Sequence, residues 1–167
     1  MKIRKSKKTD LPAIMQIFAE ARAFMWENGN MDQWKNNHPP QELIEEDIQR
    51  GVSYVCVIGE EVAEEIAAVF YFNIERDITY SKIDGKWVND EPYGVIHRIA
   101  RSMSVKGAKG AGEFCIKWCL KQHPNIRIDT HRDNAPLLRL MDKLGFTRCG
   151  IIWLANGDER VAFQKAE

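Results

Sequence analysis

Apolar residues recur along the chain at two spacings, and the changes between these spacings predict the order of the secondary-structure elements. Between Leu11 and Met25 the apolar positions follow helical periodicity, so one face of a helix is apolar. Residues 41–50 also read as a helix and stop at Gly51, which is typical of a helix end. Helices are predicted over residues 11–25, 41–50, 113–122 and 135–144.

Runs of β-branched and aromatic residues bounded by turn residues predict the strands. The strands are expected around Ile3 and over residues 52–58, 62–73, 93–101, 126–131, 147–154 and 160–165. The resulting order is β-α-α-β-β-β-α-β-α-β-β, in which hairpin runs and helix–strand alternation both occur. This order predicts an α+β fold with a mixed sheet and helices packed on it.

Three segments give weaker or unusual patterns. Residues 26–40 are rich in Asn, Gly and Pro yet contain two Trp, which predicts a loop with apolar side chains. Residues 74–92 fit either a long connection or a second small hairpin. Strand 160–165 is expected to be an exposed edge strand, and such an edge offers a surface for a homodimer.

Size and charge narrow the class of protein. The chain has 167 residues, 44% of them hydrophobic, without a break in composition, so residues 1–167 are expected to form a single domain. The 24 Lys and Arg balance the 24 Asp and Glu, which argues against a nucleic-acid partner. Without a signal-like segment or an apolar stretch of membrane-spanning length, we expect a cytoplasmic protein and no membrane partner.

The four cysteines are expected to be reduced thiols rather than a disulfide framework. Cys115 and Cys119 lie one helical turn apart, but no further Cys or His stands at ligand spacing. We therefore expect small core-facing side chains and no metal site.

The segment from Lys106 to Gly112 carries the strongest chemical signal in the chain. It follows a predicted strand, is rich in Gly and Lys, and leads into a helix. Glycines allow a tight turn and close approach to a ligand, and the free amides of a helix start attract an anion, which predicts a phosphate or pyrophosphate site. Glycine also serves purely structural turns, so that alternative stays open. A Walker P-loop and a Rossmann site both fit poorly, because neither glycine pattern is present.

Two segments resemble the signatures of the GNAT (GCN5-related N-acetyltransferase) family. The loop that ends in Gly110-Ala111-Gly112 is similar to the family's pyrophosphate loop, although Gly107 stands where Gln or Arg is usual. Asn134, followed by a helix and then by Lys143-Leu144-Gly145-Phe146, is similar to the second segment that contacts coenzyme A. The element order also matches along nearly the whole chain, so the resemblance implies a mixed, mostly antiparallel sheet flanked by helices.

The resemblance implies a set of residues for acetyl-CoA, which would enter where the strands at 95–101 and 126–131 splay apart. The backbone of Ile99, Ala100 and Arg101 would pair with pantetheine. The pyrophosphate would be held by the loop residues Lys106, Gly107, Ala108, Lys109, Gly110, Ala111 and Gly112. Asn134 would hydrogen-bond the cofactor. Lys106, Arg132 or Arg139 would meet the 3′-phosphate or belong to a solvated basic face.

The implied reaction is direct attack of an amine on the thioester, with a strand amide near Ile99 stabilising the oxyanion. For the general base, His97 is favoured, since imidazole titrates near neutral pH and strand alternation puts it on the same face as Ile99. A histidine hydrogen-bonded within the sheet is the alternative. His131 and Glu75 are further candidates. Met141 occupies the position where many members have a Tyr acid, so the general acid is unassigned.

The acceptor is expected to bind at aromatic side chains on the two loop segments: Trp26, Trp34, Tyr80 and Trp87. These rings fit equally well as covers of the core edge. The leading hypothesis is an N-acetyltransferase that acts on a primary amine of a small molecule or peptide. The rivals are a GNAT-fold module that binds CoA without catalysis, and a phosphate-binding protein unrelated to CoA.

Overall fold

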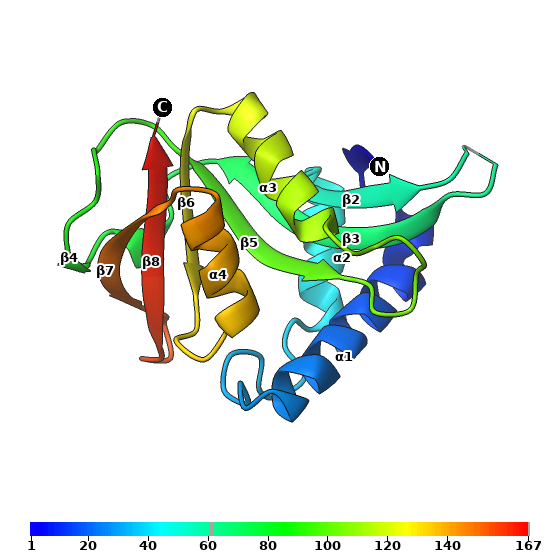
Figure 1. Ribbon diagram of the computed structural model, residues 1–167, viewed down its shortest axis with the longest axis horizontal. Coiled ribbons are helices and arrows are strands. Elements are labelled where there is room, and N and C mark those ends of the chain that lie inside the picture. The colour runs from blue at the N-terminus through cyan, green and yellow to red at the C-terminus, as the bar shows by residue number, and fades with distance from the viewer. Residues whose placement is uncertain (61, 167) are drawn as a thin grey trace.

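A single twisted sheet runs through the molecule (Figure 1). The computed structural model describes residues 1–60 and 62–166, so Glu61 of the predicted turn at 59–61 and Glu167 lie outside the description. Within these residues the sheet has eight strands in the order β1-β2-β3-β5-β6-β8-β7-β4. The strands are β1 (Lys2–Lys5), β2 (Ser53–Ile58), β3 (Glu65–Ile74), β4 (Asp84–Gly85), β5 (Gly94–Arg101), β6 (Asn125–Thr130), β7 (Thr147–Trp153) and β8 (Glu159–Ala166).

Helices cover both faces of the sheet. They are α1 (Leu11–Glu27), α2 (Gln41–Arg50), α3 (Ala111–Gln122) and α4 (Ala135–Lys143), with short 3-10 turns η1 (Lys8–Asp10) and η2 (Ile78–Tyr80). In Figure 1, α3 and α4 lie in front of the sheet and α1 and α2 behind it. Each layer has its own apolar cluster: Phe70 and Ile116 belong to the α3–α4 side, and Phe18 and Val69 to the α1–α2 side. The predicted α+β architecture is confirmed.

The structure has the predicted order of elements and one further strand, the two-residue β4. Residues 74–92 form a long connection in which β4 pairs with β7, at Asp84 with Ile151 and Gly85 with Gly150, and not with a neighbour in its own segment. Helix α1 continues to Glu27 and therefore includes Trp26, which the sequence pattern assigned to the following loop. Helix α3 begins at Ala111, two residues earlier than expected.

The expectation that residues 160–165 form an exposed edge strand is wrong. Strand β8 lies between β6 and β7 and pairs with both along its length, for example Phe163 with Ile128 and with Arg148. The outer strands of the sheet are β1 and β4. Residues 160–165 therefore offer no free strand edge to a second copy of the chain.

Strands β5 and β6 form the one parallel pair among the described strands, and they stay together only briefly. Pairing joins Gly94, Val95 and Ile96 with residues 126–128, and β5 then continues to Arg101 without β6. Gly94 permits the close start, because a Cβ there would stand 2.6 Å from the Phe72 ring and 2.8 Å from the Ile126 side chain. The strands are thus joined at one end and separate toward the other.

A β-bulge lies where β5 leaves β6. Tyr71 pairs with His97 and Val69 with Ala100, so residues 98 and 99 together oppose the single residue Phe70. Arg98 adopts a positive φ of 50°, which is uncommon for a side chain of its size. The bulge resets the alternation of side chains. The expectation that His97 and Ile99 share a face is therefore wrong: His97 shares the face of Ala100.

Helix α2 holds the bulge in place through an ion pair. The carboxylate of Asp47 accepts hydrogen bonds from Arg98 Nη2 at 2.6 Å and Nε at 3.1 Å, and its side chain is only 3% exposed. The Arg98 guanidinium also lies over the Tyr71 ring, 4.8 Å from its centroid. These contacts fix a residue whose backbone conformation is unfavourable by about 1–3 kcal/mol.

Three further properties follow from the described residues. All four cysteines are buried and free. None of the helices in this part of the chain is both long and apolar enough to cross a membrane. No group of three or more His, Cys, Asp or Glu within residues 1–60 and 62–166 is arranged to hold a metal ion.

Replacing Asp47 with Asn should destabilise the fold, because Arg98 would keep its charge in a largely buried place without a counter-ion. We expect a loss of about 3 kcal/mol in the free energy of unfolding, measured by urea titration. Glu46→Gln, on an exposed position of the same helix, is the control and should change it by less than about 0.5 kcal/mol. Equal effects of the two substitutions would contradict the role given to the ion pair.

Candidate functional site

Two clefts open where β5 and β6 separate. The larger one, about 870 Å³, is lined by residues 96–99 of β5, by Ile128 and Asp129 of β6, and by parts of the loop 28–40 and the β7–β8 turn. The smaller one, about 500 Å³, lies between α1, the end of β5 and the starts of α3 and α4. Ile99 and Leu137 line both clefts, so the two meet at the point where the strands diverge.

The smaller cleft contains about half of the residues that sequence analysis assigned to the cofactor. Ile99, Ala100, Arg101, Gly110, Gly112 and Asn134 line it, together with Arg139. The other predicted loop residues lie outside its lining: Lys106, Gly107, Ala108, Lys109 and Ala111. Ala108 and Ala111 are instead buried in the core beneath the loop.

The loop before α3 presents free amides at the start of that helix. Gly110 precedes the helix with a left-handed φ of 88°, a conformation that favours glycine. The first α-helical bond runs from Phe114 N–H to the Gly110 carbonyl, at 3.0 Å. The N–H groups of Gly112 and Glu113 lie before it and have no helical carbonyl to donate to. Both point toward the end of the helix where an anion is stabilised.

Not every amide of the loop is free. The N–H of Ala108 donates to the Val105 carbonyl at 3.2 Å, and the N–H of Ala111 donates to the Ala108 carbonyl at 3.0 Å. Two of the predicted pyrophosphate donors are therefore used in the turns of the loop itself.

An acidic residue, Glu113, also lies at this helix start. It forms ion pairs with Lys117 at 2.8 Å and with Lys143 at 2.5 Å. These two hydrogen-bonded lysines lower the pKa of Glu113 to about 2. The contact with Lys143 ties the start of α3 to the end of α4, and the two ammonium groups offset the negative charge beside the cleft.

Asn134 caps helix α4 and is connected to the loop 28–40. Its Oδ1 accepts from Leu137 N–H at 3.2 Å, and its Nδ2 donates to Gln33 Oε1 at 2.9 Å. Asn30 Nδ2 donates to the same oxygen at 2.8 Å. Asn30 lines the smaller cleft, is 3% exposed, and its Oδ1 has no hydrogen-bond partner among the described residues. Sequence analysis missed Asn30, which no pattern distinguishes from the other loop residues.

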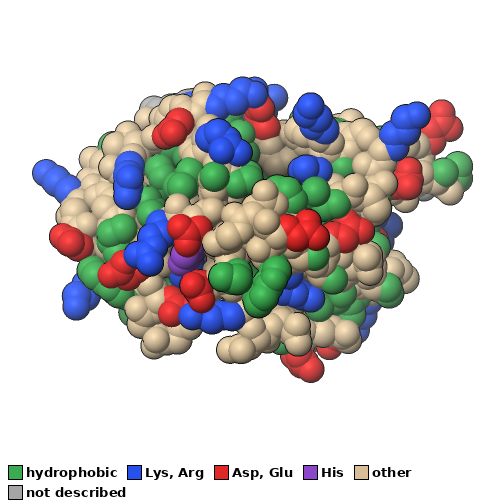
Figure 2. All heavy atoms as spheres, turned by 60° about the horizontal axis from the view of Figure 1, so that its bottom comes forward, with side chains coloured by type: hydrophobic (Ala, Val, Ile, Leu, Met, Phe, Trp, Pro, Cys, Tyr) green, Lys and Arg blue, Asp and Glu red, His purple; other side chains and the backbone are tan. Residues whose placement is uncertain are grey.

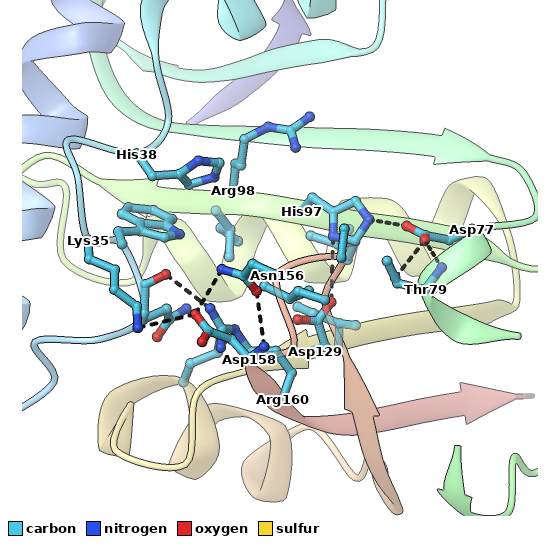
Figure 3. Close-up of a pocket in the computed structure, with 18 of the residues that line it drawn as sticks. Lys35, His38, Asp77, Thr79, His97, Arg98, Asp129, Asn156, Asp158 and Arg160 are labelled. Carbon is cyan, nitrogen blue, oxygen red and sulfur yellow. Dashed lines mark hydrogen bonds and ion pairs between the residues drawn. The ribbon is translucent and has the colours of Figure 1, made fainter. Parts of the chain in front are cut away.

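In the larger cleft, His97 lies between two carboxylates (Figure 3). Its Nε2 is 2.6 Å from Asp77 Oδ2, and its Nδ1 is 3.6 Å from Asp129 Oδ1. Asp77 also accepts hydrogen bonds from the N–H and hydroxyl of Thr79, at 2.8 and 2.6 Å. Burial raises the pKa of Asp77, but the bonds from His97 and Thr79 outweigh it and lower that pKa to about 2.

The predicted acceptor aromatics are dispersed in the structure. Trp34 lines the larger cleft and packs edge-on against Phe18 with ring centroids 5.5 Å apart. Trp26 is 67% exposed on α1 and lies outside both linings. Tyr80 and Trp87 are buried below the site, so for these two the alternative role as parts of the core edge fits the structure.

Tyr80 supports the site from beneath. Its hydroxyl donates to Asp129 Oδ1 at 2.7 Å, and its carbonyl accepts from Trp87 Nε1 at 3.1 Å. Burial, followed by the nearby Asp129 carboxylate, raises the pKa of Tyr80 well above its ordinary value. The Tyr80 hydroxyl therefore remains a hydrogen-bond donor and holds the Asp129 carboxylate near His97.

The other catalytic candidates lie away from the junction of the clefts. His131 is buried and accepts from Asp133 N–H at 3.2 Å, and Glu75 accepts from Tyr71 and Asn73. Neither lines a cleft. Met141 is fully buried in the cluster between the sheet and the helices α3 and α4. Its position therefore presents no side chain to either cleft.

Sequence analysis missed the two acids beside His97. Asp129 lies within the predicted strand 126–131, two residues before His131, and its place there was a usable signal. Asp77 lies in the connection 74–92, where no periodicity placed it.

Charged side chains of both signs gather around the larger cleft. On the face shown in Figure 2, basic and acidic side chains lie side by side around a histidine. In Figure 3, His38 and Arg98 lie on one side of the cleft, and Asp129, Asp158 and Arg160 on the other. Arg160, which is 5% exposed, is a further residue that sequence analysis missed.

Comparison by sequence finds no match: no family model fits the chain, and no curated protein matches it. Comparison with solved structures finds acetyltransferases of similar fold over the full length. The fold is similar over its full length to that of GNAT-family acetyltransferases. The resemblance expected from the sequence is confirmed, and the GNAT fold implies binding of an acyl-CoA.

Three solved structures illustrate the similarity. A GNAT-family acetyltransferase from Streptococcus agalactiae has a TM-score of 0.86 and 29% identity, covering 99% of this chain and 95% of that one. A candidate acetyltransferase from Staphylococcus aureus has a TM-score of 0.68 and 27% identity, covering 99% of both chains. A GNAT-family acetyltransferase from Listeria monocytogenes shares the fold, with a TM-score of 0.69, 20% identity, and coverage of 98% and 93%.

The low pKa of Asp77 gives a pH-dependent prediction for Asp77→Asn. The carboxylate titrates at about 2 in the folded protein against 3.8 ordinarily, so its stabilisation is present above pH ~4 and is lost as pH falls through about 2. At about 1.4 kcal/mol per pKa unit, the free energy of unfolding of the wild type should exceed that of the variant by roughly 2.5 kcal/mol at pH 6. Urea titrations from pH 6 to pH 2 should show this difference shrinking toward zero. A difference that is constant with pH would contradict the assignment.

Proposed function

We propose that this chain is an acetyl-CoA-dependent N-acetyltransferase that acts on a primary amine of a small molecule or peptide. The observation that carries the proposal is the meeting of two different clefts at Ile99 and Leu137. One cleft has an anion-attracting helix start, and the other has a histidine held by a carboxylate. On this proposal residues 1–167 act as one domain, acetyl-CoA is a co-substrate, no metal takes part, and the protein works in the cytoplasm.

The smaller cleft suits coenzyme A. Its lining includes the apolar side chains of Phe24 and Leu140, and the backbone of β5 beyond Ile96, which is not paired with β6, offers hydrogen bonds to pantetheine amides. The free amides of Gly112 and Glu113 face the expected pyrophosphate. Arg139 and Arg101 line the same cleft and supply positive charge for phosphate groups.

His97 is proposed as the general base. An ionised carboxylate only accepts hydrogen bonds, so the contact with Asp77 assigns the proton to Nε2 and leaves the lone pair on Nδ1. Nδ1 lies on the side of Asp129, and both His97 and Asp129 line the cleft. Nδ1 then takes the proton of the incoming ammonium group, while Asp77 acts as a positioning residue that fixes the ring.

The remaining steps need little from side chains. A strand N–H near Ile99 is proposed to stabilise the oxyanion, because the backbone there is released from pairing with β6. The departing thiolate belongs to a thiol with a pKa near ~8.5 and leaves without a strong acid. The second candidate function, a module that binds CoA without catalysis, is favoured by one observation: Met141 replaces the usual Tyr and is fully buried.

Ligand-dependent thermal stability tests the cofactor site. Acetyl-CoA and CoA should raise the melting temperature, whereas ATP and NAD should not. Gly110→Glu should abolish the increase, because it adds bulk and negative charge at the start of α3. Gly157→Glu is the matched control, since Gly157 also has a φ near 88° and open space around its Cα yet lies outside both linings. A flat response of wild type to CoA would sink the proposal.

Steady-state kinetics test the base. His97→Asn should lower kcat by roughly 100-fold or more, since a positioned general base contributes about 10²–10⁴. The KM for acetyl-CoA should stay near the wild-type value, because His97 does not line the smaller cleft. The remaining activity should rise with pH as more free amine forms. A variant with unchanged kcat would remove His97 from the mechanism.

A further inference from the structure

The cations that line the larger cleft differ in how their charge is balanced. Lys35 Nζ lies 3.4 Å from Asp158 Oδ2. Arg98 forms its close pair with Asp47. Each of these charges therefore has a carboxylate within ion-pair distance.

Arg160 has no such carboxylate among the residues that the structure describes. Its guanidinium donates to two neutral acceptors, the carbonyl oxygens of Glu159 at 2.8 Å and of Gln33 at 3.1 Å. The side chain is nonetheless almost completely buried, and burial lowers the pKa of Arg160, with Asp129 and Asp158 opposing this from a greater distance. A buried cation that faces a cleft without a close counter-ion favours an anionic ligand.

His38 lies on the opposite side of the same cleft (Figure 3). Burial, and after it the charges of Arg98, Arg160 and Arg22, lower the pKa of His38. Arg22 also donates to the His38 carbonyl at 3.3 Å. The imidazole thus has three guanidinium groups as its electrostatic neighbours, which favour its neutral form, a hydrogen-bond donor across the cleft from Arg160.

The part of the cleft around His97 is acidic. Asp77 and Asp129 lie on either side of the imidazole, and the Asp129 side chain is 10% exposed. The larger cleft therefore presents two carboxylates around the proposed base and, near them, the buried guanidinium of Arg160, with the neutral His38 across the cleft.

We propose that the acceptor is a free amino acid, whose ammonium group lies toward Asp129 and His97 and whose carboxylate is bound by Arg160 and His38. This inference rests on the proposed function and names its substrate class. A diamine or polyamine has no anionic group that could form an ion pair with Arg160. Because Arg160 is 5% exposed, the carboxylate has to enter the cleft, which favours a free amino acid over a protein chain.

The chemistry balances without a further reactant. The amine nitrogen bonds to the thioester carbonyl carbon, and the carbon–sulfur bond breaks. The ammonium group first gives one proton to His97, the nitrogen gives a second proton to the CoA thiolate after the attack, and His97 releases its proton to solvent. The products are the N-acetyl amino acid and CoA.

Matched acceptors test the carboxylate site. Each amino acid is compared with its amide and with its decarboxylated amine, for example phenylalanine, phenylalaninamide and phenethylamine, or lysine, lysinamide and cadaverine. β- and γ-amino acids vary the distance between the two charges. We expect kcat/KM, followed by release of the CoA thiol, to be about 10- to 100-fold higher for the acid, as charge-assisted binding implies.

Three variants assign this preference to residues. Arg160→Gln should remove the preference through KM, while the rate with the decarboxylated amine stays within about threefold, and Arg160→Lys should restore part of it. His38→Asn tests the same site from an independent loop, which matters because Arg160→Gln alters a buried group. Lys35→Gln is the matched control, because the Lys35 charge in the same cleft is already balanced by Asp158, and it should keep the preference.

The outcomes separate this inference from the proposed function. Equal turnover of acids, amides and amines, with Arg160→Gln lowering all of them alike, overturns the inference and leaves the transferase intact. If none of the acceptors is acetylated, thermal shifts of the CoA-bound protein test whether the carboxylate site exists. Stabilisation by amino acids and not by their amides, lost in Arg160→Gln, upholds the carboxylate site although transfer fails. Shifts that do not distinguish acid from amide overturn it.

Discussion

The ion pair between Asp47 and Arg98 fixes the feature on which both clefts depend. It holds a bulge in β5 at residues 98 and 99, two residues beyond Ile96, the last residue that pairs with β6. Without the bulge, β5 would continue its alternation and Ile99 would not reach the junction from the α3–α4 side. A partly buried ion pair contributes little net stability, but losing one partner is costly, so its main effect is to select one geometry. Helix α2 thereby fixes the local conformation of β5, although the two elements are far apart in the sequence.

A second dependence links the two clefts through the loop 28–40. Gln33 accepts hydrogen bonds from Asn134 and Asn30 on the side of the smaller cleft and from Arg160 on the side of the larger one. Its side-chain and backbone oxygens thus hold the cap of α4 and the buried cation of β8 in one network. The positions of these groups are coupled, because moving Gln33 leaves buried donors on both sides without acceptors.

Local patterns predicted most elements because helices and strands follow from periodicities within about ten residues. Helix α2 was predicted to the residue, since the apolar spacing and Gly51 agree. The internal place of β8 was not predictable, as strand order depends on pairing with β6 and β7, far away in sequence. The bulge at Arg98 also lacks a local signal. It reversed the expected face of His97 relative to Ile99, while Asp77 came from a connection without periodicity.

The burial of Met141 has a consequence for how the proposed chemistry is divided. Helix α4 contributes only the apolar Leu137 to the junction of the clefts, so no side chain of that helix can exchange a proton there. The groups that can, His97, Asp77 and Asp129, all lie in the larger cleft. The pH dependence and the choice of acceptor therefore arise from the same set of charges. A substitution that changes the charges next to His97 should alter both together, whereas one in the smaller cleft should alter only the affinity for CoA.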